Sequence, residues 1–134
     1  MSYRKTVHWA ALAGLALIFG QAGIEKVVAS PGMVEGMASI GFGWTWTLLI
    51  GIAEVLGVVG LALGVLHPAI KNVAVLWLLP FGVGAFTVHM SYHHGFRDYW
   101  QSMAVCLLSA VVLWADERFK VVLNGGRTAG EAST

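Results

Sequence analysis

Four long apolar stretches constrain this chain more than any other feature of its sequence. They cover about residues 6–26, 44–66, 70–91 and 98–116, each bounded by charged, turn-forming or aromatic residues. A helix of about 20 apolar residues crosses the hydrocarbon core of a bilayer, which is roughly 30 Å thick. Lipid offers no partners for unpaired backbone groups, so such segments cross as helices. We therefore expect an all-α fold, a bundle of four transmembrane helices.

The composition excludes an ordinary soluble domain. Hydrophobic residues make up 57% of the chain and charged residues 11%, whereas soluble domains carry about 25% charged residues. The net charge of +1 gives no reason to expect a nucleic-acid partner. The single cysteine, Cys106, excludes an internal disulfide framework and a CxxC redox pair. The expected surroundings are a lipid bilayer.

The order of the stretches predicts one membrane domain over residues 1–120 and a mobile cytoplasmic tail over 121–134. With four spans, both termini and the loop between the second and third stretches lie on one side of the membrane. That side holds Arg4, Lys5, Lys71, Arg118, Lys120 and Arg127, and the other holds Lys26 and Arg97. Cytoplasmic loops carry the excess of lysine and arginine. We therefore expect a plasma (inner) membrane protein with cytoplasmic termini, and an amphipathic segment along the outer surface over residues 27–43.

Small residues predict where the helices touch. In the second stretch they recur at spacings of three and four residues, at Ala53, Gly57, Gly60 and Gly64. Small residues spaced in this way let the backbones of membrane helices approach closely. We interpret this series as a packing surface.

Glu54 is the most informative polar residue. It lies ten positions after Trp44, hence about 15 Å below the outer interface at about 1.5 Å per residue. A carboxylate near mid-membrane costs at least about 2.5 kcal/mol unless it is paired or protonated. Glu54 shares a helical face with Gly51 and Gly57, so we expect it to point into the bundle.

Further polar residues fall in the same outer half of the predicted bundle. Gln21 and Lys26 lie near the end of the first stretch, and His89 and His93 lie four positions apart at the end of the third. The inner half, in contrast, looks almost wholly apolar. The sequence thus predicts an outward-facing pocket, with Glu54 and His89 as catalytic candidates. The predicted ligand-binding residues are Gln21, Lys26, Glu54, His89 and His93.

Several chemistries fit these residues. Glu54 and His89 could exchange protons near neutral pH, and the pocket could hold an amphipathic molecule such as a quinone. Glu54 could instead only tie helices together. A soft metal such as copper would need ligands drawn from His89, His93, His94, Met33, Met37 and Met90. Two histidines at i,i+4 spacing are weak evidence for such a site, so we expect no metal. No strong catalytic motif is present, and the sequence leaves open whether the protein is an enzyme.

At these residues the chain resembles the DoxX-like family of small four-helix membrane proteins. The resemblance covers roughly residues 12–114. Its motif pieces, in chain order, are Phe19-x-x-x-Gly23-x-x-Lys26, then Glu54 with the glycines Gly57, Gly60 and Gly64, then His89 at the end of the third helix.

The resemblance implies a setting in membrane redox systems, including thiosulfate oxidation coupled to quinone, and by position it points to Lys26, Glu54 and His89. It favours a subunit or accessory protein of a quinone-linked system, with quinone as the candidate cofactor. Other membrane subunits or further copies of the chain would be its partners. The alternative is a non-catalytic assembly or structural subunit of a larger membrane complex. Two features depart from the family: His8 stands about where an arginine is often found, and paired cysteines are absent.

Overall fold

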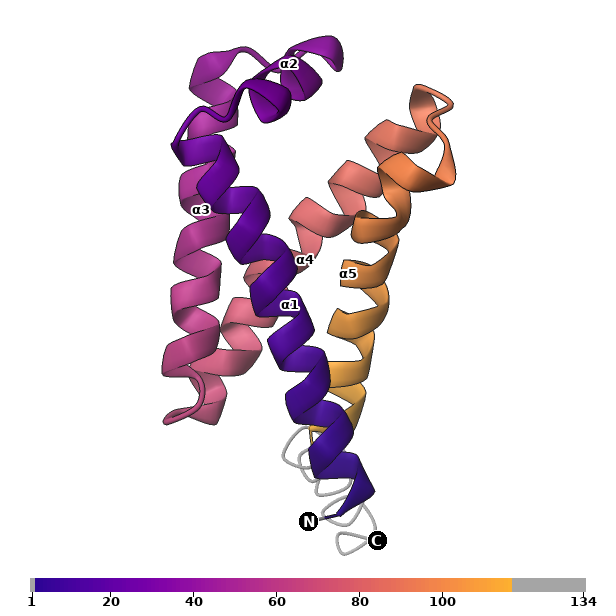
Figure 1. The fold of residues 1–134 in the computed structure, drawn as a ribbon. Helices are drawn as coiled ribbons and strands as arrows, with labels where there is room; N and C mark the ends of the chain where they lie inside the picture. The colour runs from indigo at the N-terminus through magenta and orange to yellow at the C-terminus, as the bar shows by residue number, and fades with distance from the viewer. Residues whose placement is uncertain (1, 117–134) are drawn as a thin grey trace, which may run out of the picture.

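The computed structural model describes residues 2–116, and these residues form five helices (Figure 1). The helices are α1 (Tyr3–Val27), α2 (Pro31–Ser39), α3 (Trp44–Leu63), α4 (Pro68–Ser91) and α5 (Phe96–Ala115). All but α2 are long and apolar enough to cross a membrane. This arrangement confirms the predicted all-α bundle of four transmembrane helices. The predicted tail over 121–134 lies outside the described residues.

The four long helices form a ring in which each packs against two others. α1 contacts α3 and α5, and α4 contacts the same two helices. The start of α1, the α3–α4 turn and the end of α5 lie together, and we call this the N-terminal end (Figure 1). The opposite end carries α2 and the α4–α5 turn, and we call it the α2 end. Toward the α2 end, α4 and α5 spread away from α1 and α3 (Figure 1).

Large apolar side chains lie on the outside of the ring as well as in its core. The core joins α1, α4 and α5 through fully buried side chains, among them Leu15, Val75, Leu78 and Val112. Large apolar side chains also cover the outside, among them Leu17, Leu49, Leu56, Val73, Leu107 and Trp114. Soluble monomers rarely expose apolar patches of this extent. Lipid solvates such a surface, so the outward-facing side chains of the long helices fit a bilayer.

Glycines set the close approach of α3 and α4. A Cβ atom on Gly57 would collide with the side chain of Leu78, and one on Gly60 would lie 2.9 Å from the Cβ of Ala74. Gly64 faces Lys71 so closely that a Cβ would lie 2.6 Å from the Cα of that residue. The glycine series read from the sequence is therefore a packing surface along most of this helix pair.

The ends of α1 and α2 turn the chain sharply at the α2 end. After α1, Ala29 adopts a left-handed backbone (φ 56°), and the Ser30 N–H donates to the Glu25 carbonyl at 2.9 Å. After α2, Gly41 also adopts a left-handed backbone (φ 91°). A left-handed residue followed by a hydrogen bond back over the last turn is the Schellman motif. These two turns lay α2 across the end of the bundle, where none of its residues is buried.

The contact between Gly64 and Lys71 gives a direct test of the α3–α4 packing. Gly64→Ala should destabilise the protein by about 1–3 kcal/mol, because its methyl group meets Lys71 backbone atoms that cannot move cheaply. Gly84→Ala is the matched control, since nothing lies within 4 Å of its Cβ position. Thermal unfolding in mild detergent, followed by circular dichroism, measures both. Equal stability of the two variants would contradict the close approach.

Candidate functional site

The structure places Glu54 inside the bundle, paired with Lys26. Glu54 lies in the middle of α3 and Lys26 in the last turn of α1. The Lys26 Nζ lies 2.9 Å from the Glu54 Oε2, and the two side chains are only 8% and 7% exposed. The same Nζ donates to the Ala22 carbonyl at 3.4 Å. A buried carboxylate and a buried ammonium thus neutralise each other between two helices.

Two glycines bring α1 and α3 close enough for this pair. A Cβ on Gly51 would lie 2.6 Å from the Cβ of Lys26 and 3.1 Å from the Gly23 carbonyl oxygen. A Cβ on Gly23 would lie 3.2 Å from both the Gly51 carbonyl oxygen and the Cβ of Glu54. The two helices cross at Gly23 and Gly51, directly beside the ion pair. Gly23 and Gly51 therefore position Lys26 and Glu54 next to each other.

A cavity of about 810 Å³ lies beside this pair, at the α2 end. All five helices contribute to its wall, which is mostly apolar. α2 supplies Met33 and Met37. The charged and histidine side chains of the wall are Glu25, Lys26, Glu54, His89, His94 and Asp98. An apolar pocket of 300–1,000 Å³ with a few convergent polar groups is typical of small-molecule sites.

The predicted site residues divide into two groups. Lys26, Glu54 and His89 line the cavity. Gln21 is exposed and does not line the cavity, but it donates at 3.2 Å to Glu25, which does. His93 is exposed as well and lies beyond the end of α4. The structure therefore brings three of the five residues together.

The i,i+4 spacing from His89 predicted His93 in the cavity wall, but the structure places His94 there. The His94 Nδ1 lies 2.8 Å from the His89 Nδ1, within hydrogen-bond distance. Asp98, in the first turn of α5, also lines the cavity. Neither residue could be selected from an i,i+4 pattern, because α4 ends at Ser91 and the chain reverses before His94.

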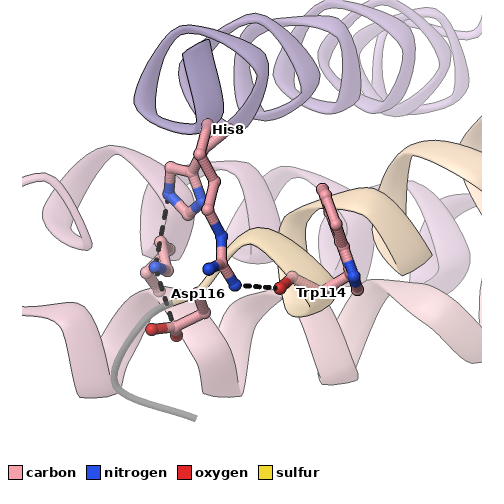
Figure 2. Close-up of polar contacts among 5 residues, drawn as sticks. His8, Trp114 and Asp116 are labelled. Carbon is pink, nitrogen blue, oxygen red and sulfur yellow. Dashed lines mark hydrogen bonds and ion pairs between the residues drawn. The ribbon is translucent and has the colours of Figure 1, made fainter. Parts of the chain in front are cut away.

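A second buried charge cluster lies at the N-terminal end, where the sequence looked almost wholly apolar (Figure 2). The Lys71 Nζ lies 3.4 Å from the Asp116 Oδ2 and 3.3 Å from the His8 Nε2. The Lys71 and Asp116 side chains are 7% and 5% exposed. This cluster joins α1, α4 and the end of α5, and it corrects the expectation of an apolar inner half.

Arg4 flanks the second cluster on α1. Its Nη2 donates to the Trp114 carbonyl at 2.9 Å, and its guanidinium lies 5.3 Å from the centre of the Trp114 ring. Figure 2 shows His8 on α1 across from Trp114 and Asp116 at the end of α5. Among residues 2–116, no group of three or more His, Cys, Asp or Glu side chains is placed to hold a metal ion.

The fold and the buried charges define a small integral membrane protein with a mostly apolar cavity, beside a buried ion pair, at one end of four spans. The family model described as DoxX-like family matches residues 10–115. The chain belongs to the DoxX-like family, which confirms the resemblance carried by its motif residues. Comparisons with curated proteins and with solved structures gave no match.

The ion pair predicts a characteristic pattern of stability. Lys26→Met alone or Glu54→Met alone should cost about 3–5 kcal/mol, because each leaves the other charge buried without its partner. The double variant should recover most of that loss, since it removes both charges from the core. Thermal unfolding in detergent measures the three proteins.

The control for this series is Glu35→Met, which removes a carboxylate from an exposed position of α2. Its effect should stay within about 0.5 kcal/mol. A double variant as unstable as the sum of the two single variants would show that Lys26 and Glu54 do not interact.

Proposed function

We propose that the cavity binds a small amphipathic molecule of the quinone type, and that the protein serves a membrane redox system as a subunit or accessory. The observation that carries this proposal is a buried ion pair in the wall of an otherwise apolar cavity. Charges in the interior of a membrane protein are expensive and tend to mark functional sites. The redox part of the proposal is inferred from membership of the DoxX-like family.

The residues of the wall fit such a ligand. Lys26 carries three N–H donors, of which Glu54 and Ala22 accept two, so the third is available to a ligand carbonyl oxygen. Apolar side chains such as Phe19, Phe42 and Phe81 supply the surface for a ring or a hydrocarbon tail. A bound quinone would supply two-electron, two-proton chemistry, with the electrons coming from a redox partner.

The roles of Glu54 and His89 in this proposal are to hold and transfer protons. Glu54 faces the cavity from α3 and His89 from α4. A carboxylate and an imidazole can each accept or release a proton near neutral pH once their surroundings are adjusted. Because the rest of the wall is largely apolar, protons would reach a bound molecule through these side chains.

The proposed setting is the plasma membrane, with both termini in the cytoplasm. The described part of the N-terminal end carries Arg4 and Lys5, and the sequence adds further basic residues after residue 116. The α2 end carries only Lys26 and Arg97. By the positive-inside rule the cavity then faces the outer side of the membrane.

Binding of a short-chain quinone tests the proposal. Purified protein in mild detergent is titrated with decylubiquinone, and quenching of tryptophan fluorescence reports binding. Glu54→Gln should weaken binding about tenfold, the effect of losing about 1.4 kcal/mol, because glutamine keeps the size but not the charge. Ala85→Trp should abolish binding by filling the cavity, whose wall includes Ala85.

The matched control is Leu49→Ala, on the exposed face of α3. It should bind the quinone as the wild type does. Equal binding by all four proteins would place the quinone in the detergent or on the lipid-facing surface, and would overturn the proposed site. Purification with a stoichiometric membrane partner and no quinone binding would favour the assembly or structural role.

A further inference from the structure

His89 and His94 form a pair whose geometry restricts the protons that it can hold. The two Nδ1 atoms lie 2.8 Å apart, and the ring planes are tilted by 54°. At that distance one Nδ1 must carry a hydrogen and the other must offer a lone pair, because two N–H groups would repel each other. The two imidazoles therefore share one hydrogen between their facing nitrogens.

We propose that the His89–His94 pair is the proton-accepting unit of the α4 wall, that it takes up one proton and no second, and that His94 is the positioning residue of His89. The inference rests on the proposed function of the cavity. In the neutral pair one ring donates its Nδ1–H, and its own Nε2 is free. That Nε2 accepts the added proton and gives an imidazolium bonded to a neutral imidazole. A further proton would have to occupy the accepting Nδ1 and would break the contact.

The backbone at the end of α4 creates this pair. His93 adopts a left-handed conformation (φ 54°), and the His94 N–H donates to the His89 carbonyl at 3.0 Å. The His93 N–H donates to the Met90 carbonyl at 3.1 Å. These are the two hydrogen bonds of a Schellman motif, in which the residue after the left-handed one folds back over the last turn. In a Schellman motif an apolar side-chain contact usually spans this turn. Here the imidazoles of His89 and His94 make that contact instead.

The charged side chains that share the cavity with the pair come from α1, α3 and α5. Asp98 of α5 lines the cavity together with His89 and His94. From α1 the wall includes Glu25 and Lys26, and from α3 it includes Glu54. Since Glu54 and Lys26 neutralise each other, two carboxyl groups remain to balance one imidazolium. α2 adds no titratable side chain to the wall.

Nuclear magnetic resonance of the full-length protein in detergent micelles, labelled with ¹⁵N-histidine, tests this without any ligand. A hydrogen bond between two ring nitrogens transmits a scalar coupling, so one coupled pair of Nδ1 signals is expected. His94→Phe should abolish the coupling while keeping a ring in place. His93→Asn should retain it, because asparagine tolerates the left-handed backbone and the two rings remain.

A pH titration completes the test. The coupled rings should gain one proton between them, and the coupling should disappear if a second is forced on. Absence of coupling in the wild type, its persistence in His94→Phe, or two imidazolium rings that remain coupled would each overturn the inference. Because no quinone is present, a coupled pair in a protein that fails to bind decylubiquinone would remove the proposed function and leave the pair standing.

Discussion

A charge inside this bundle has to be neutralised where it lies, because neither lipid nor the apolar core can solvate it. Among residues 2–116, the buried lysines Lys26 and Lys71 each meet this constraint with a carboxylate from another part of the bundle. The pairs therefore join segments that lie far apart in the sequence as well as balancing charge. α1 is tied to α3 by Lys26 at the α2 end, and His8 brings it beside Lys71 of α4 at the N-terminal end. Between the two clusters the fully buried side chains include Leu15, Val75, Leu78 and Val112, and the Trp77 Nε1–H donates to the Ala53 carbonyl at 2.9 Å.

The second cluster also resolves a conflict with the helix dipoles. Lys71 lies in the first turn of α4, and Asp116 follows the last residue of α5. A cation at a helix N-terminus and an anion at a C-terminus each oppose the macrodipole. Placed 3.4 Å apart, the two charges offset a penalty that neither helix could relieve alone. The placement makes sense only when α4 and α5 are considered together.

The sequence was sufficient for the features that depend on local pattern. Length and hydropathy predicted the four spans, and the glycine spacing predicted the α3 surface that packs against α4. Features that depend on how helices end or cross could not be predicted from the sequence. His93 was favoured over His94 because an i,i+4 count assumes an unbroken helix, whereas α4 stops at Ser91. Gln21 shares a face with Glu25, and Lys26 is the residue on the adjoining face that meets Glu54.

Lys71 and Asp116 were missed for a related reason. Charges at the ends of apolar stretches normally belong to water or lipid headgroups. Their burial follows from the course of the helices at the N-terminal end, where side chains from α1, α4 and the end of α5 meet (Figure 2). Such a course is set by contacts between residues far apart in the chain.

The sequence separation within each cluster has a consequence for how the protein enters the membrane. Glu54 follows Lys26 by 28 residues, so the first tie can form once α3 has been inserted beside α1. Asp116 follows Lys71 by 45 residues and comes directly after α5, so the second tie must wait until α5 has left the ribosome. Assembly would thus proceed from an α1–α3 hairpin to the closed ring, with the N-terminal end sealed last.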